Sequence, residues 1–169
     1  AEPSVSRSYT GAQAPVLGFF ARMSPQKGLD KLVEAYIALR QSGLQPNLKL
    51  VIGGSYSPSD VSFVRRLQKQ LGAFDLLDDV EFRPNVDRRT KIWLLQSMTV
   101  FSVPVRYREA FGMYLLEAMA AGVPVVQPPT NAFPEIIGET GGGVICESDD
   151  TPSLARAIQQ VLEDLDLRK

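Results

Sequence analysis

Short apolar segments that alternate with helical patterns are the feature that most constrains what this 169-residue chain can fold into. Residues 16–20 (VLGFF) form a continuous apolar run, as expected of a strand that is buried on both faces. Strands separated by helices need crossover connections, and these favour parallel pairing. The sequence therefore predicts an α/β fold: a Rossmann-like, three-layer domain with a mostly parallel sheet of about six strands. The predicted strands cover residues 16–20, 48–52, 79–83, 99–103, 123–127 and 142–146.

Helices are predicted in most of the connections, while the proline-rich segment after residue 127 is predicted to be a loop. In open α/β sheets, ligands bind outside the carboxyl ends of the strands, so the loops that follow the strands are the candidate functional segments. The helical patterns run over about residues 32–43, 57–72, 88–98, 112–121 and 154–162.

Composition narrows the chemistry. The chain has 18 Lys and Arg against 19 Asp and Glu, a net charge of −1, so we expect no nucleic-acid partner. It has one cysteine, Cys146, and no histidine, which excludes an internal disulfide, a cysteine-based zinc site and a histidine-ligated metal. Ser-His-Asp and Cys-His catalysis are excluded as well, so any chemistry must rest on carboxylates, Arg, Lys, hydroxyls and backbone groups.

The first residues differ from the rest of the chain. The segment AEPSVSRSYTGAQAP is polar and does not resemble a signal peptide, and no run in the sequence has the length and apolar character of a membrane span. We predict a linker, or a boundary inside a longer protein, over residues 1–14 and one domain over residues 15–169.

The loop after the first predicted strand carries two cations, Arg22 and Lys27, just before a helix. A helix N-terminus together with a guanidinium fork and an ammonium suits a diphosphate, although two solvated cations on a turn would give the same pattern. In the next loop, Gly53 and Gly54 would let the backbone approach a ligand closely, or would simply form a turn. Neither a P-loop nor a GxGxxG fingerprint is present.

The strongest signal is RYREAFGMYLLEAMAAG over residues 106–122. Glu109 lies in the loop, and Glu117 follows eight positions later inside the helix, between apolar neighbours. A buried carboxylate needs hydrogen-bond donors, and a vicinal diol such as ribose offers two. Glu109 could meet a ligand whose phosphates rest on the amides of residues 111–114. The structural alternative is an ion-paired helix glutamate and a loop glutamate in solvent. Glycoside hydrolysis would need the two carboxyls to face each other across a cleft.

These segments resemble the motifs of the retaining glycosyltransferases of family 4, glycosyl transferases group 1, which have the GT-B fold. REAFGMYLLEAMAAGVPVV, with its Glu-x7-Glu spacing, resembles the nucleotide-sugar motif of that family. ARMSPQKG over residues 21–28 resembles its Gly-Arg-Leu-x-x-x-Lys-Gly segment, and DVEF over residues 79–82 resembles the strand before its nucleobase loop. Pro134-Glu135 and the glycines at 141–143 resemble its Pro-Glu and Gly-x-Gly stretch, so the resemblance covers about residues 16–164.

The resemblance implies the C-terminal, donor-binding half of a GT-B enzyme, whose active site lies between this domain and an N-terminal acceptor domain. It implies that the positions of Arg22 and Lys27 neutralise the diphosphate and that Glu109 contacts the donor sugar, which makes these three the predicted catalytic residues. Glu117 is predicted to hold the ribose hydroxyls. The remaining predicted donor-binding residues are Phe111, Gly112, Met113 and Tyr114 for phosphate and sugar oxygens, Asn85 and Val86 for the base, and Gly54.

The resemblance also implies a reaction without metal or other cofactor, because Arg, Lys and a helix N-terminus take the leaving charge. The implied partners are a nucleoside-diphosphate sugar and the acceptor domain of the same protein. We expect the full protein in the cytoplasm, with contact to the cytoplasmic membrane face only through that other domain. The domain by itself is expected to bind nucleotide without turnover.

Two segments depart from the family pattern. Ala21 stands where a glycine usually precedes the arginine, and residues 53–56 (GGSY) replace the commoner Gly-Asp-Gly-Pro. A nucleotide-sugar epimerase of similar architecture is the second interpretation, and a non-enzymatic nucleotide-sugar-binding module is the third. Retention of the two cations and the two glutamates together argues against a degenerate binder.

Overall fold

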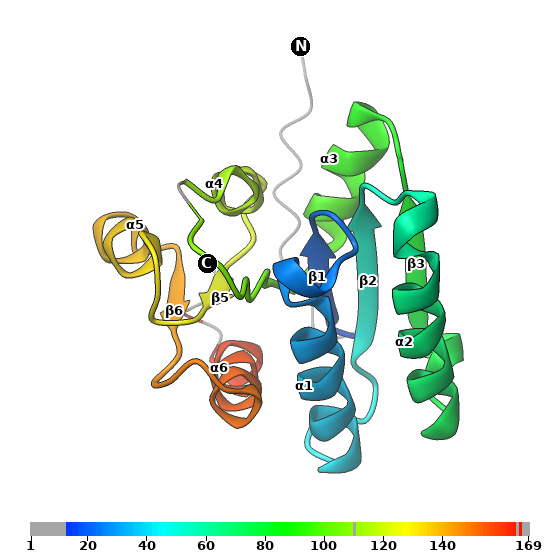
Figure 1. Ribbon diagram of the computed structural model, residues 1–169. Helices are drawn as coiled ribbons and strands as arrows, with labels where there is room; N and C mark the ends of the chain where they lie inside the picture. Colours follow the sequence, from blue (N-terminus) through cyan, green and yellow to red (C-terminus); the bar gives the residue numbers. More distant parts are fainter. Residues whose placement is uncertain (1–12, 110, 165, 167–169) are drawn as a thin grey trace.

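The computed structural model describes residues 13–109, 111–164 and 166, which build a six-stranded sheet (Figure 1). The strand order is β3-β2-β1-β4-β5-β6, and every strand pair is parallel. This is the order of doubly wound nucleotide-binding folds, so the predicted fold class is confirmed. The strands are β1 (Val16–Phe20), β2 (Lys49–Gly54), β3 (Val80–Pro84), β4 (Val100–Phe101), β5 (Val125–Gln127) and β6 (Gly143–Ile145).

Helices cover both faces of the sheet. One layer holds α1, α2 and α6, and the other holds α3, α4 and α5 (Figure 1). Within the first layer, α1 packs against α6. Short 3-10 turns, η1 (Pro25–Lys27), η2 (Pro58–Asp60) and η3 (Leu77–Asp79), lie in the connections. The helices are α1 (Leu29–Gln41), α2 (Val61–Ala73), α3 (Arg88–Ser97), α4 (Met113–Ala120), α5 (Phe133–Thr140) and α6 (Thr151–Glu163).

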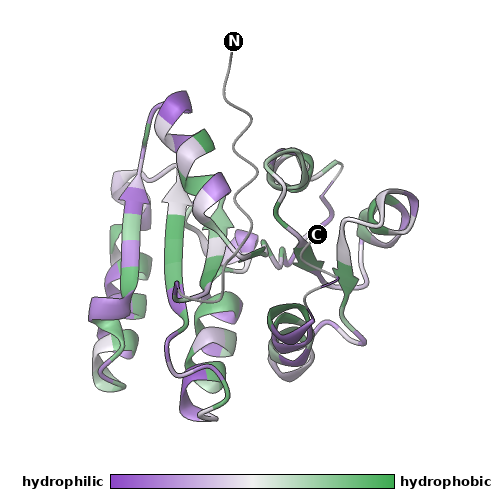
Figure 2. Cartoon of the chain, turned by 180° about the vertical axis from the view of Figure 1, so that it is seen from behind, coloured by the Kyte–Doolittle hydropathy of each residue, from purple (hydrophilic) through white to green (hydrophobic). Residues whose placement is uncertain are grey.

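The hydrophobic core follows from this layering. Figure 2 shows the central strands as the most hydrophobic segments and the helices with polar and apolar stripes. Leu17 and Phe19 of β1 and Leu50 and Ile52 of β2 are fully buried, because helices shield both faces of a parallel sheet. None of the helices in the described ranges has the length and apolar character needed to cross a membrane.

The expectation of a loop after β5 is partly wrong, because α5 forms there. Pro134 lies in the first turn of this helix, where its missing N–H would have no intrahelical partner anyway. Phe133 and Ile137 are buried and hold the helix to the core. The predicted boundary over residues 1–14 falls almost wholly outside the described residues.

Strand β4 is shorter than the predicted 99–103, since a side chain takes over its pairing with β5. The amide of Gln127 is fully buried. Its Oε1 accepts a hydrogen bond from the backbone N of Val103 at 2.9 Å, and its Nε2 donates to the backbone O of Val103 at 3.0 Å. Gln127 thus replaces a peptide group where the backbone turns away from the sheet.

Gln127→Met should lower the free energy of unfolding by roughly 2 kcal/mol. The variant keeps a similar volume, but it leaves the buried backbone N–H of Val103 without its acceptor and removes one of the two donors to the Val103 carbonyl, which keeps the bond from Val105 N. Gln96→Met, on the exposed face of α3, should change it by less than about 0.5 kcal/mol. Urea unfolding of both variants measures the difference. A loss as small in Gln127→Met as in the control would show that the amide does not hold this turn.

Candidate functional site

The loops after β1 and β4 lie against each other at the carboxyl edge of the sheet. Gly28 has a φ of 73°, and a Cβ on it would lie 1.8 Å from the carbonyl O of Pro104, so only glycine allows this approach. The backbone N of Arg106 donates to the O of Gln26 at 2.9 Å, and the Arg106 guanidinium donates to the O of Pro25 at 3.1 Å. The two loops therefore form one continuous surface.

Lys27 and Glu109 meet on this surface. Lys27 Nζ donates to Glu109 Oε2 at 2.6 Å, and the two side chains are only 19% and 18% exposed. The rings of Tyr107 and Tyr114 flank the ammonium, with centroids at 5.1 and 5.2 Å, and both hydroxyls donate to the same Oε2, at 3.3 and 3.4 Å. The Lys27 ammonium is thus held by one carboxylate and two aromatic rings.

Ionisation in this cluster follows from its contacts. Burial lowers the pKa of Lys27, but the hydrogen bond to Glu109 and the contact with Tyr107 outweigh burial and raise that pKa above its ordinary value. Burial, with the charge of Glu109 added, raises the pKa of the Tyr114 hydroxyl. At neutral pH the cluster therefore holds a charged ammonium and a neutral tyrosine donor.

Arg22 lies on the other flank of the β1 loop and is tied to η2. Its Nε and Nη2 donate to Asp60 Oδ1 at 3.3 and 3.1 Å, and Nη2 also donates to Ser59 Oγ at 3.2 Å. Asp60 is only 6% exposed and accepts from Ser57 N at 2.9 Å and Ser57 Oγ at 2.8 Å. Burial raises the pKa of Asp60, but the Ser57 and Arg22 hydrogen bonds outweigh it and hold the pKa below its usual range.

The N-terminus of α4 also lies at this site, since Tyr114 is the second residue of the helix. Gly112 is the N-cap with a φ of 61°, and the N–H groups of Met113 and Tyr114 fall in the first helical turn, where no intrahelical acceptor is available. Phe111 and Met113 are 64% and 59% exposed. An anion near Lys27 would therefore meet both an ammonium and the positive end of a helix.

Glu117 is placed differently from the sequence argument. Its Oε2 contacts Lys91 Nζ of α3 at 2.6 Å, and the side chain is 41% exposed. The expected buried carboxylate is wrong: Glu117 is half-exposed and ion-paired, as in the structural alternative. Glu109, which that alternative put in solvent, is instead mostly buried on Lys27.

The three remaining predicted residues lie together at the ends of β2 and β3. Gly54 has a φ of 125°, and a Cβ there would lie 1.9 Å from the O of Ala21. Asn85 binds the backbone of Tyr56 with both ends of its amide: Oδ1 accepts from Tyr56 N at 3.0 Å, and Nδ2 donates to Tyr56 O at 2.9 Å. The Asn85 side chain is thus occupied in fixing the β2 loop, while Val86 packs on the core.

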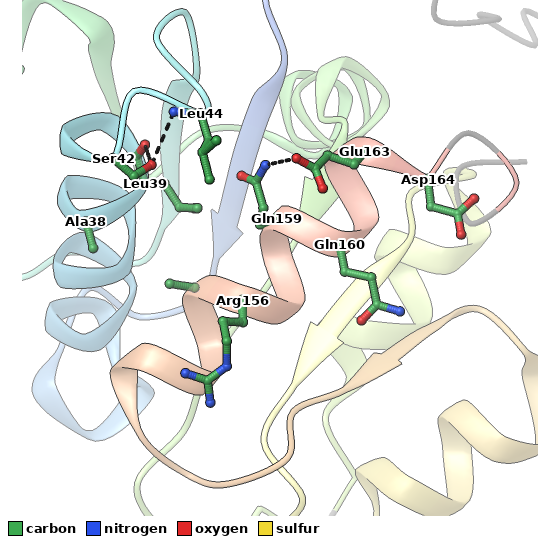
Figure 3. Close-up of a pocket in the computed structure, with 10 residues that line it drawn as sticks. Ala38, Leu39, Ser42, Leu44, Arg156, Gln159, Gln160, Glu163 and Asp164 are labelled. Carbon is green, nitrogen blue, oxygen red and sulfur yellow. Dashed lines mark hydrogen bonds between the residues drawn. The ribbon is translucent and has the colours of Figure 1, made fainter.

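The larger of two cavities in the structure does not lie at the carboxyl edge of the sheet. A cavity of about 730 Å³ lies between the C-terminal ends of α1 and α6, where Leu39, Leu44, Arg156 and Gln159 line it (Figure 3). These helix ends lie at the amino edge of the sheet, away from every predicted site residue. A smaller cavity of about 410 Å³ lies beside Arg22, so the chemistry of the side chains, rather than the larger volume, marks the carboxyl edge as the candidate site.

The sequence also matches known proteins. Residues 7–169 match the family model described as Glycosyl transferases group 1. The chain belongs to this family. It is 32% identical over 154 residues to the lipopolysaccharide core biosynthesis mannosyltransferase LpsB of Rhizobium meliloti, over 88% of this chain and 41% of that protein. The present chain thus spans less than half the length of that relative.

Two solved structures share the fold. The C-terminal domain of the glycosyl transferase group 1 family protein LpcC from Francisella tularensis is 25% identical with a TM-score of 0.78, over 91% of this chain and 78% of that one. HepE of Anabaena, in complex with UDP-glucose, is 25% identical with a TM-score of 0.78, over 92% of this chain and 41% of that one.

Sequence reasoning missed the residues that hold the predicted ones in place. These are Tyr107, Asp60, Lys91 and Asn131, whose amide binds the backbone of Tyr107 and Glu109. Only Asp60 had a visible signal in the sequence. Ser57 and Asp60 have the spacing of a capping box, which places a carboxylate at a loop-to-helix junction near the β1 loop. Among the described residues, no group of three or more His, Cys, Asp or Glu could hold a metal ion, and metal-independent chemistry stays a prediction.

Asp60→Asn should destabilise the domain at pH 7, since the carboxylate that binds Ser57 and Arg22 loses its charge. The pKa of Asp60 is lower in the folded state than in the unfolded state, so its stabilising effect exists above about pH 4 and is lost as the pH falls through the folded-state pKa. The difference in unfolding free energy between wild type and variant should therefore shrink as the pH falls, which urea unfolding at about pH 7, 4 and 2.5 measures. Exposed Asp78→Asn is the control, and a pH-independent difference for Asp60→Asn would contradict this role.

Proposed function

We propose that this chain is the C-terminal, donor-binding domain of a retaining glycosyltransferase. It would bind a nucleoside-diphosphate sugar at the carboxyl edge of the sheet and face an acceptor held by an N-terminal domain. The observation that carries the proposal is the contact of Lys27 with Glu109 beside the N-terminus of α4. It joins a cation for the diphosphate to a carboxylate for the sugar.

The residues divide the donor between them. Lys27, Arg22 and the first N–H groups of α4 stabilise the charge that develops on the diphosphate as the bond from the sugar to the phosphate oxygen breaks. Because Lys27 and Glu109 share one contact, a phosphate on Lys27 and a sugar hydroxyl on Glu109 lie next to each other. The leaving phosphate then takes the proton of the acceptor hydroxyl, and the oxygen of that hydroxyl bonds to the anomeric carbon on the face from which the phosphate departs. This retains the anomeric configuration. No metal is required in this scheme.

The names of the similar proteins support transfer of a sugar from a nucleotide sugar. LpsB is named a mannosyltransferase, and the HepE structure holds UDP-glucose. A nucleoside-diphosphate sugar is thus the substrate class that we propose for this chain. We further propose a cytoplasmic location for the full protein, in which any contact with the membrane face belongs to the acceptor domain.

Lys27→Met combined with Arg22→Ala should weaken nucleoside-diphosphate binding at least about tenfold, since each charge-assisted contact contributes on the order of 1.5–3 kcal/mol. Calorimetric titration of this chain with UDP, GDP and ADP measures the loss and identifies the base. Lys69→Met, on exposed α2, removes a charge away from the site and is the control. Equal affinity of the double variant and wild type would exclude a diphosphate on these cations.

Glu109→Gln and Glu117→Gln should differ in ligand selectivity. Glu109→Gln should keep or raise affinity for the bare diphosphate, because Lys27 loses its anionic partner, and should weaken binding of the sugar nucleotide. Glu117→Gln should weaken both ligands alike, because ribose is common to them. Titration of each variant with UDP and UDP-glucose, and with GDP and GDP-mannose, separates the two roles.

Lys91→Met is the matched control for Glu117, because it breaks the same ion pair and keeps the carboxylate. We expect it to bind nucleotide nearly as wild type does. If Lys91→Met and Glu117→Gln lost affinity equally, Glu117 would act through its pairing with α3 and not through ribose.

A further inference from the structure

Asn131, in the loop between β5 and α5, has a φ of 59°, in the left-handed region that favours glycine and tolerates asparagine. Its side chain binds the loop that carries Glu109. Oδ1 accepts from the backbone N of Glu109 at 3.1 Å, and Nδ2 donates to the backbone O of Tyr107 at 3.3 Å. The amide therefore offers this loop the same donor and acceptor that a neighbouring strand would offer.

The loop needs such a partner because the sheet ends before it. Up to Arg106 its backbone is held by contacts within itself and with the β1 loop, such as Val105 N to Val103 O at 2.9 Å. Across residues 107–109, the backbone hydrogen bonds found within the described part of the chain are the two to Asn131. The position of Glu109 therefore depends on a side chain from the next strand-end loop.

The carboxylate of Glu109 is held unevenly. Its Oε2 accepts from Lys27, Tyr107 and Tyr114, whereas its Oε1 has no hydrogen-bond donor among the residues that the structure describes. One oxygen is thus fixed and the other is available to accept a hydrogen bond. Where Oε1 lies is set by where the backbone of residue 109 is held.

We propose that Asn131 is a positioning residue, which holds the Glu109 loop so that Oε2 stays on Lys27 and Oε1 is available to a hydroxyl of the donor sugar. The part of this inference that concerns the sugar rests on the proposed function, whereas the hold on the loop rests on the hydrogen bonds alone. The competing explanation is that Asn131 only occupies a turn with positive φ. A glycine would then serve equally well.

The chain allows these explanations to be separated. Asn131→Gly keeps the backbone conformation and removes both hydrogen bonds. Asn131→Asp keeps an acceptor for Glu109 N but cannot donate to Tyr107 O, and it adds a negative charge beside the loop. Asn47→Gly, at an exposed position before β2, is the matched control for replacing asparagine with glycine.

The experiment combines hydrogen exchange with ligand titration of the four chains. In Asn131→Gly, amide exchange over residues 103–112 should be at least about tenfold faster than in wild type and in Asn47→Gly, with exchange in β2 and α1 unchanged. The preference for UDP-glucose over UDP, or for GDP-mannose over GDP, should fall about fivefold or more, while affinity for the bare diphosphate changes less than about twofold. Asn131→Asp should show a smaller change in exchange than Asn131→Gly, because one hydrogen bond remains.

Two outcomes overturn the proposal. Unchanged exchange over residues 103–112 in Asn131→Gly would show that the amide does not hold the loop. Faster exchange with an unchanged sugar preference would show that the hold does not serve the sugar. If wild type bound none of these nucleotides, the proposed function would fail, and the exchange rates would still decide whether Asn131 holds the loop.

Discussion

The parallel pairing of β1 with β4 is the constraint on which the candidate site depends. These strands are neighbours in the sheet but not in the sequence, and they join at two register positions, Leu17 with Val100 and Gly18 with Phe101. The Met98 side chain packs directly on the backbone of Gly18, where a Cβ would lie 2.0 Å from Met98 Sδ. This seam brings the two strand-end loops together, and the contact of Lys27 with Glu109 follows from it.

Amide side chains complete what the short strands leave unpaired. Gln127 binds Val103, Asn85 binds Tyr56, and Asn131 binds the loop of Glu109, each through a donor and an acceptor at once. An amide is the side chain that most closely reproduces a peptide group. The site residues therefore sit on loops that leave the sheet but remain hydrogen-bonded to a neighbour.

Fold class followed from the sequence because strand and helix periodicities are local properties of the chain. The helix α5 did not, since Pro134 is a loop signal unless its place in the first turn is known. Glu117 was expected to be buried because its sequence neighbours are apolar. In a helix, however, adjacent residues lie about 100° apart and face different surroundings, so Leu115 and Ala118 are buried while Glu117 reaches Lys91.

No local sequence pattern could show which residues contact the predicted site residues. Lys27 and Glu109 are separated by 82 positions, and Arg22 and Asp60 by 38. The family resemblance named Lys27, Arg22 and Glu109 one by one, but only the packing of the loops shows what holds each of them. Asn131 gave no signal, because a left-handed asparagine has no signature of its own in a sequence.

The hydrogen bonds from an amide on one loop to the backbone of the next loop determine which segments of this domain can be exchanged as a unit. Glu109 lies on the loop after β4, yet its backbone N and the backbone O of Tyr107 are bonded to Asn131 of the loop after β5. Grafting the first loop from a relative of different specificity would carry over the carboxylate without its anchor. The smallest transplantable unit here is a pair of neighbouring loops.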